Sequence, residues 1–523
     1  MPRALRPLLL ALTLPLLAIA CGVNPVTGKK ELQLVGTDRE VAIGREQYRP
    51  SRQAQGGDLV IDAPLTAYVQ RVGAKLAAVS DRPLPYEFVV LASGVPNAWA
   101  LPGGKIAVNR GLLLALEDEA ELAAVLGHEI VHAAARHGAQ SMERGLLAQV
   151  GLAAIAIGTA KDEHRDLIVG GATLGAALVT TKYGRDAELE SDRYGMTYML
   201  RAGYDPHSAV TLQEKFVKLS AGRSQGWLEG LFASHPPSAE RVATNARTEQ
   251  ALLAGGAPRG MLGAAEYRQA IAGIVADAPA YAAFDEGRKA LAGGDAKGAL
   301  ALAQKAAKAE PREALFHGLA GVALEKLGDP SGAGHAYDAA IQRNPNFFEF
   351  WLRRGLLKRR AGDGAGARTD LEHAHGLLPT AASAEALGQF ALAGGDEEGA
   401  LGYLRQAAGS NSAEGQRAAH TVVRLELVRQ PGKFVQVVGE RDARGMVVLV
   451  VTNRAPLAIQ DLKLVALLRD PQSGVQLGAQ QLALPNRFAA GATLKVATKL
   501  GPLSDPNALR GLQVEVRGAA VAP

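Results

Sequence analysis

A period of 34 residues in the second half of the chain limits its fold more than any other feature. Prolines stand at positions 311, 345 and 379, and Gly-Asp pairs begin at positions 294, 328, 362 and 395. Small residues keep the same register, since alanines stand five and twelve residues before each proline and a glycine stands 24 residues before it. Because the prolines, the Gly-Asp pairs and the small residues share one period, residues 280–412 are predicted to form a stack of equivalent helical units, not an ordinary alanine-rich bundle. The small residues are Gly287, Ala299, Ala306, Gly321, Ala333, Ala340, Gly355, Ala367 and Ala374.

This repeat resembles the tetratricopeptide repeat, whose unit is a pair of helices. The resemblance implies an all-α solenoid with a concave surface, in which small side chains let the paired helices approach closely. Three units are clear, and a fourth, ALGQFALAGGDEEGALGYLRQAA, lacks the closing proline. We interpret the fourth as a degenerate repeat or a cap.

From about residue 430 the pattern changes to an alternation of apolar and polar residues. Turn residues separate six short runs of this kind within residues 430–523. Period-two alternation is typical of strands with one buried face, so this segment is predicted to be a small all-β sandwich. The runs are KFVQVV, MVVLVVTN, LKLVALL, VQLGAQQLAL, TLKVATKL and LQVEVRG.

The segment before the repeats mixes helical and extended patterns. PLTAYVQRVGAKLAAV has helical periodicity, whereas YEFVVLAS and KIAVN are typical of strands, so residues 22–255 are predicted to form an α+β domain. The net charge of +5 is small for 523 residues, and no dense basic run with interleaved aromatic residues occurs. These features argue against a nucleic-acid partner.

The first 21 residues are typical of an export signal. Arg3 and Arg6 precede an apolar stretch that is too short for an ordinary membrane span, and the stretch ends at Cys21, the only cysteine. LLAIAC resembles a bacterial lipobox, although Ala18 stands where leucine is usual. The resemblance implies that Cys21 is lipidated and, because Gly22 follows and not aspartate, that the chain is anchored to the outer membrane and faces the periplasm. A plain signal peptide with an incidental cysteine is the alternative.

One predicted helix carries three of the eleven histidines. In DEAELAAVLGHEIVHAAARHG, His128 and His132 are four residues apart, so both rings can reach one metal ion from one face. Glu129 stands beside them, where it can take a proton from water. His137 is off that face and is interpreted as a favourable charge at the helix C-terminus, with Gly138 as the end of the helix.

A third ligand has to come from another part of the chain, and DAELESDRYG offers acidic candidates. Glu188 and Asp192 are four residues apart on a predicted helix. Glu188 can ligate the ion, with Glu190 as its competitor. Asp192, one turn further on, can accept the ring N–H of a ligand histidine.

Taken in order, NAWALPGG, HEIVH and the Glu188–Asp192 pair followed by Gly195 resemble the HtpX-like and BepA-like zinc metallopeptidases. The resemblance covers about residues 25–250, and SHPPSAERV matches the His-Pro motif of that family at His235, Pro236 and Arg241. Together with the signal and the repeats, it is closest to the periplasmic BepA-type branch.

The resemblance implies a zincin-like metallopeptidase fold and assigns roles to the residues. His128, His132 and Glu188 would bind one Zn²⁺ ion, and Glu129 would be the general base. His235 would be a fourth, displaceable ligand that restrains the enzyme when no substrate is present.

The same resemblance gives the NAWALPGGKIAV segment the role of an edge strand beside the zinc. Such a strand can accept a substrate backbone as an added strand, which favours unfolded chains over a particular sequence. Asn97, Ala98, Trp99, Ala100 and Leu101 would then bind the substrate. The alternative is that Trp99 and Leu101 belong to the core.

The sequence thus predicts a zinc endopeptidase of the bacterial cell envelope that degrades misfolded or stalled outer-membrane proteins. The outer-membrane assembly machinery would be a partner of its repeats. A chaperone or scaffold lipoprotein, with a latent protease site, is the second hypothesis. The third is an integral-membrane protease, because two apolar runs flank KDEHRD within residues 145–180. Each run has about fifteen residues, so a buried helical hairpin beside the active site is expected instead.

Overall fold

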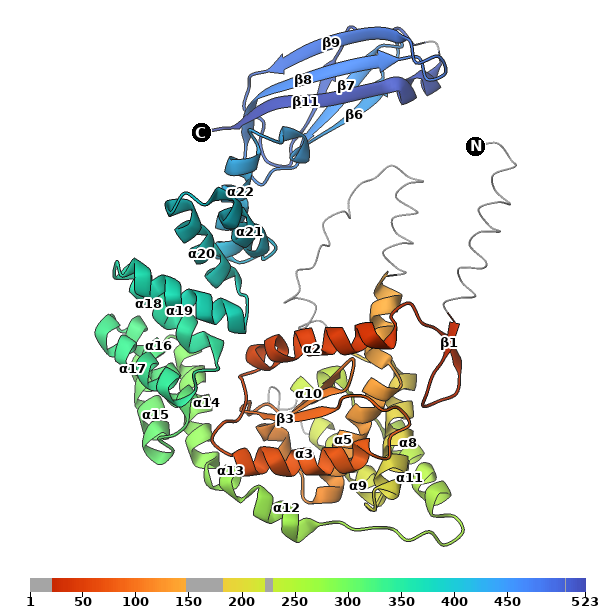
Figure 1. Cartoon of the computed structure of the whole chain (residues 1–523), viewed down its shortest axis with the longest axis vertical. Coiled ribbons are helices and arrows are strands. Elements are labelled where there is room, and N and C mark those ends of the chain that lie inside the picture. Colours follow the sequence, from red (N-terminus) through yellow and green to blue (C-terminus); the bar gives the residue numbers. More distant parts are fainter. Residues whose placement is uncertain (1–20, 147–181, 222–228, 504) are drawn as a thin grey trace. The chain divides into compact units, whose positions relative to one another are not determined.

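The computed structural model describes residues 21–146, 182–221, 229–503 and 505–523 of the chain (Figure 1). The chain divides into two compact units, Met1–Pro379 and Thr380–Pro523. Residues 1–20 of the predicted signal and nearly all of the apolar segment 145–180 lie outside the described residues. Within the described ranges, no helix combines the length and apolar character needed to cross a membrane.

A small mixed sheet organises the first part of the first unit. Its order is β3-β5-β4, with β3 (Glu87–Leu91) parallel and β4 (Ala98–Leu101) antiparallel to β5 (Lys105–Asn109). Successive side chains of a strand point to opposite faces, and both faces are covered here. Val89, Leu91, Trp99 and Leu101 pack with residues of α2 (Thr37–Ala54). Phe88, Val90, Ala98 and Ala100 pack with residues of α3 (Ala63–Ala77) and α5 (Glu119–Ala134). The predicted α+β arrangement is confirmed.

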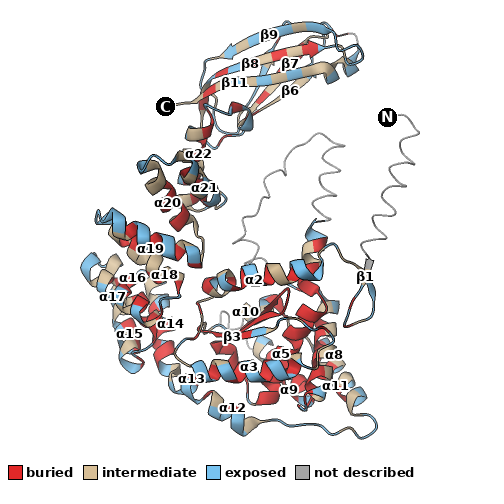
Figure 2. Cartoon of the chain, in the orientation of Figure 1, coloured by how far each residue is buried: buried red, intermediate tan, exposed pale blue. Residues whose placement is uncertain are grey.

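Helix α5 lies at the centre of this region, and every one of its residues is buried (Figure 2). Asp118 caps its N-terminus by accepting a hydrogen bond from the Glu121 N–H. Helices α8 and α9 contact α5, α10 follows them in the chain, and α11 contacts both α8 and α9 (Figure 1). Their bounds are Arg185–Arg201, His207–Ala221, Glu229–Ser234 and Ala239–Leu253.

The end of α5 differs from the prediction. The helix ends at Ala134, not at Gly138, and Arg136 adopts the left-handed conformation with φ 65°. Glycine is the usual residue in that conformation. Here the Arg136 guanidinium is buried among three carboxylates, and these contacts hold the turn. They are Glu31 at 2.9 Å, Glu40 at 2.7 Å and Glu143 at 3.1 Å.

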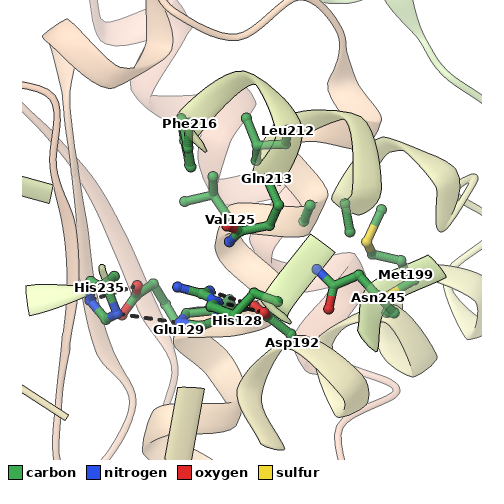
Figure 3. Close-up of a pocket in the computed structure, with 14 residues that line it drawn as sticks. Val125, His128, Glu129, Asp192, Met199, Leu212, Gln213, Phe216, His235 and Asn245 are labelled. Atoms are coloured by element: carbon green, nitrogen blue, oxygen red, sulfur yellow. Dashed lines mark hydrogen bonds and ion pairs between the residues drawn. The ribbon is translucent and has the colours of Figure 1, made fainter. Parts of the chain in front are cut away.

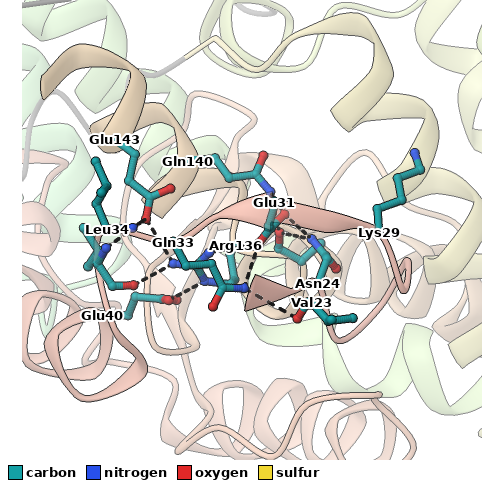
Figure 4. A network of polar contacts seen from close by, with 12 residues as sticks. Val23, Asn24, Lys29, Glu31, Gln33, Leu34, Glu40, Arg136, Gln140 and Glu143 are labelled. Atoms are coloured by element: carbon teal, nitrogen blue, oxygen red, sulfur yellow. Dashed lines mark hydrogen bonds and ion pairs between the residues drawn. The ribbon is translucent and has the colours of Figure 1, made fainter. Parts of the chain in front are cut away.

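These contacts belong to a polar network that attaches the N-terminal segment to α5 (Figure 4). Asn24 donates a hydrogen bond from Nδ2 to the Ala135 carbonyl oxygen at 2.9 Å. Glu143 accepts from the Leu34 and Val35 backbone N–H groups, each at 2.9 Å. Two short strands, β1 (Cys21–Val23) and β2 (Lys30–Leu32), pair in the same segment. The polar lead-in is therefore an ordered part of this domain.

Six helices of the repeat region follow in the first unit and form three pairs. The Gly-Asp pairs mark the turn inside each pair: Gly294, Gly328 and Gly362 have positive φ, and the following aspartate caps the next helix. Close approach explains the other glycines, since a Cβ on Gly321 would lie 2.5 Å from Tyr337 Cε1. The predicted helical repeats are confirmed. The short α12 (Ala264–Ala270) and α13 (Ala272–Ala276) precede them, and the six helices are α14 (Ala278–Ala292), α15 (Ala296–Ala309), α16 (Ala314–Lys326), α17 (Pro330–Arg343), α18 (Phe348–Arg360) and α19 (Gly364–Leu377).

The second unit holds the last repeat helices and the sandwich. Helices α20 (Ala381–Ala393) and α21 (Glu397–Ala408) turn at Gly395 and Asp396, and α22 (Ala413–Glu426) follows them. Two antiparallel sheets, β10-β7-β6 and β11-β8-β9, enclose one apolar core. All six predicted strands are present: β6 (Val435–Arg441), β7 (Val447–Asn453), β8 (Ile459–Arg469), β9 (Gln476–Leu484), β10 (Thr493–Ala497) and β11 (Leu512–Val521).

Candidate metal centre

Four buried side chains from three places in the sequence meet beside α5. His128 and His132 come from α5, Glu188 comes from the first turn of α8, and His235 follows the end of α10. One ligand atom from each lies within 4.8 Å of the others. The Nε2 atoms of His128 and His132 are 2.9 Å apart, and His235 Nδ1 is 3.0 Å from Glu188 Oε1.

The protonation of the two helix histidines suits a metal. His128 Nδ1 lies 2.9 Å from Asp192 Oδ1, and since a carboxylate only accepts, this nitrogen carries the proton. The lone pair of His128 is then on Nε2, which faces the other ligand atoms. Burial lowers the pKa of His132 well below its usual range, so its ring is neutral. Three nitrogens and a carboxylate around one point are a donor set that Zn²⁺ takes.

Asp192 is held in turn by a bidentate ion pair with Arg241 on α11. Arg241 donates from Nε and Nη2 to the two Asp192 oxygens, each at 2.7 Å, and its Nη1 is 2.9 Å from Glu188 Oε2. Burial alone would raise the pKa of Asp192, but Arg241 and His128 hold this pKa below its usual range. Arg241 thus orients the Asp192 carboxylate that contacts His128, and it also offsets the negative charge of Glu188.

Glu129 lies next to the cluster without belonging to it. Its carboxylate is buried, and within the described part of the chain its Oε2 has no hydrogen-bond partner. The nearest cation candidate is His235, whose Nε2 is 3.6 Å from Glu129 Oε1. Burial raises the pKa of Glu129, which favours a carboxylate able to accept a proton near neutral pH.

Residues 64–249, which include every residue of this site, match the family model "Peptidase family M48". The chain carries a peptidase domain of family M48. The residues present fit the zinc that peptidases of this family use.

Several metallopeptidases are similar to part of the chain. The mitochondrial metalloendopeptidase OMA1 of Schizosaccharomyces pombe is 33% identical over 42% of this chain and 63% of its own length. A putative beta-barrel assembly-enhancing protease of Vibrio cholerae is 30% identical over 43% of this chain and 48% of its own length. The metalloprotease YcaL of Escherichia coli is 28% identical over 43% of this chain and 93% of its own length. The chain thus spans less than two thirds of the first two relatives.

Part of the chain is also similar to a solved structure. A thermophilic tetratricopeptide-repeat protein of Thermus thermophilus matches 35% of this chain and 95% of its own, at 20% identity and a TM-score of 0.25. The repeat assignment rests on the helix pairs and their glycine turns, described above.

His137 in the M48 domain has a different place from the one predicted. It is not a charge at a helix end, because α5 ends before it and its ring is 2% exposed. Its Nδ1 lies 2.9 Å from His132 Nδ1, and its Nε2 lies 3.5 Å from Glu190 Oε2. Glu190, the competitor for the third ligand position, faces His137 and Lys29 instead of the ligand cluster.

Tyr183 also belongs to the site, although no motif in the sequence indicates it. Its ring stacks on His132, with the centroids 4.0 Å apart and the planes 24° from parallel. Tyr183 lies two residues before the start of α8, in a segment without a motif of its own. No local pattern in the sequence could have identified it.

The predicted substrate strand is β4 of the M48 domain. Among the described residues β4 pairs with β5 alone, so it is an edge strand. The side chains of Trp99 and Leu101 are buried against α2, as the core alternative requires. Asn97, just before β4, is also buried, and its Oδ1 has no partner in the described structure. Any contact with a substrate is left to the backbone of Ala98–Leu101 and to Asn97.

Proposed function

We propose that the chain is a zinc endopeptidase of the bacterial cell envelope that degrades misfolded or stalled outer-membrane proteins. The observation that carries the proposal is the buried set of His128, His132 and Glu188 with the unpartnered carboxylate of Glu129 beside it. The export signal and the Vibrio cholerae relative, a putative beta-barrel assembly-enhancing protease, support the location and the substrate class. We assign the activity to residues 22–255.

The residues divide the chemistry among themselves. His128, His132 and Glu188 would hold the zinc ion, which when bound would polarise the scissile carbonyl and lower the pKa of the attacking water. Glu129 takes a proton from that water and later delivers it to the leaving amine. Asp192 keeps the proton of His128 on Nδ1 and thereby keeps Nε2 on the metal side.

The substrate would bind in extended form along β4. An edge strand offers backbone N–H and C=O groups to any extended chain, so an unfolded protein is favoured whatever its sequence. The repeats would supply the selectivity that β4 lacks, by docking substrates or the outer-membrane assembly machinery on their concave surface.

Removal of the metal tests this function. The purified full chain should cleave an unfolded substrate such as reduced, alkylated casein, and should contain about one zinc per chain by elemental analysis. A chelator should abolish the cleavage, and added zinc should restore it. Cleavage that survives complete removal of the metal contradicts the proposal.

His235 is proposed to be the displaceable fourth ligand. It lies 3.0 Å from Glu188 and 3.6 Å from Glu129, in the space that a substrate carbonyl and water need. His235→Ala should therefore keep zinc and increase cleavage, by about tenfold if the histidine keeps nine tenths of the chains closed. Casein cleavage and metal content measured on the same preparation check this. Loss of zinc would make His235 an ordinary ligand.

The same closed arrangement favours a second candidate function, a chaperone or scaffold with a latent protease site. His235 and the other residues of the cluster are buried, and a fourth ligand in the place of the substrate would keep the protease site latent. In that case the repeats would do the main work. The Glu129→Gln variant, which should lack proteolytic activity, distinguishes the two candidates.

A lipid at Cys21 is proposed to anchor the chain in the outer membrane. Cys21→Ser should therefore move the chain from the membrane fraction to the soluble fraction, because the described helices offer no membrane span. Flotation of the purified Cys21→Ser chain with lipid vesicles checks this. Flotation equal to that of the wild type would instead support membrane insertion of residues 145–180.

A further inference from the structure

Three buried polar residues, four positions apart, lie on one face of helix α11: Arg241, Asn245 and Glu249. Arg241 pairs with Asp192, and Glu249 lies 3.0 Å from His207 Nδ1 and 2.9 Å from Arg259 Nη1. Asn245, between them, is 1% exposed, and neither its Oδ1 nor its Nδ2 has a partner among the described residues. Burying an amide without partners is unfavourable, so the fold retains Asn245 at a cost in stability.

A second unpartnered amide oxygen lies on α9, opposite α11. Gln213 is 7% exposed, and the described residues offer its Oε1 no donor. Gln213 and Asn245 line the same cavity of about 50 Å³, which also borders His128, Glu129 and His235 (Figure 3). Two unsatisfied amides thus lie in a cavity that begins at the candidate general base.

Apart from the ion pair between Asp192 and Arg241, the remaining wall of this cavity is apolar. Its side chains come from α5, α8 and α9, and they are Ala124, Val125, Met196, Met199, Ala209, Leu212 and Phe216. The nearest cation, Arg241, is already bound by Asp192 and Glu188, so it is neutralised. An apolar wall with two amides at one place fits a side chain that has an apolar stem and an uncharged polar end.

We propose that this cavity binds the substrate side chain next to the scissile bond and selects glutamine or asparagine. A carboxamide donates from its NH₂ and accepts at its oxygen, so it can satisfy the Oδ1 and Nδ2 of Asn245 together and still donate to Gln213 Oε1. An anionic side chain would lack a free counter-ion there, because Arg241 is already paired with two carboxylates. An aliphatic side chain would leave both amides unpaired, which is how a site built for hydrogen bonds rejects an analogue without them. The proposal rests on the proposed endopeptidase function.

Cleavage-site mapping tests the proposal. The wild-type chain is incubated with unfolded casein, and the new termini are identified by mass spectrometry. Two peptides that differ only in glutamine or leucine at the preferred position are then compared. The glutamine peptide should be cleaved with a kcat/KM at least about tenfold higher. Asn245→Leu should reverse this preference and should unfold at an equal or higher temperature, since it removes an unsatisfied amide.

The control is Gln250→Leu, which removes an exposed amide from the same helix and should leave the preference unchanged. Absence of any cleavage by the wild type would overturn the endopeptidase function itself, and the subsite with it. Cleavage without enrichment of glutamine or asparagine beside the scissile bond would overturn the subsite alone. An Asn245→Leu chain with an unchanged preference would also overturn it, because the amides would then bind only water.

Discussion

Glu129→Gln should lower kcat/KM for an unfolded substrate by about 10²–10⁴-fold, the usual contribution of a general base. The substitution keeps the size and polarity of the side chain but removes its ability to accept a proton from water. Glu129 Oε2 has no partner in the described structure, so the change breaks no structural hydrogen bond there. Zinc content and melting temperature should stay at the wild-type values.

Glu214→Gln on α9 is the matched control, because this carboxylate is exposed. It should cleave the substrate at the wild-type rate. The Glu129→Gln chain is then expressed in cells that lack the wild-type protein. If it restores the cell envelope fully, proteolysis is dispensable and the scaffold hypothesis replaces the proposed function.

Arg136→Met should destabilise the M48 domain by about 3–5 kcal/mol, the cost of removing one partner from a buried ion pair. The Arg136 side chain is 2% exposed, and its loss leaves Glu31, Glu40 and Glu143 close together without it. It also leaves a left-handed turn without the contacts that hold it. Urea unfolding and hydrogen exchange of the α5 amides measure the effect.

Arg144→Met provides the comparison, since Arg144 is exposed and, in the described structure, donates a hydrogen bond to Ser141 on the same helix. Its effect should stay within about 0.5 kcal/mol. Equal stability of the Arg136 and Arg144 variants would mean that the carboxylates are protonated or solvated without Arg136. The network would then not hold the end of α5.

Features with a local period could be predicted from the sequence. The 34-residue register gave the helix pairs because each Gly-Asp pair encodes its own turn, a left-handed glycine followed by an N-cap aspartate. The six strands followed from alternation. The spacing of four between His128 and His132 placed both rings on one face, since helix geometry requires it.

Features decided by contacts between distant segments could not be predicted in this way. Glycine is the commonest helix stop, so the sequence favoured Gly138, whereas carboxylates from residues 31 and 40 stabilise the turn at Arg136. Tyr183 reaches His132 from 51 positions further along the chain. Asn245 is an ordinary polar residue of α11 until α9 and α8 close the cavity around it.

The network around Arg136 has a consequence for how far the enzyme could act from a membrane. Asn24 is hydrogen-bonded to the residue that follows α5, and it is only three residues from Cys21. Three residues span at most about 10 Å, so almost no flexible linker would separate a lipid on Cys21 from the folded domain. The protease domain would then be unable to move far from the membrane into the periplasm. It would stay at the bilayer surface, with access only to chains that stall or emerge there.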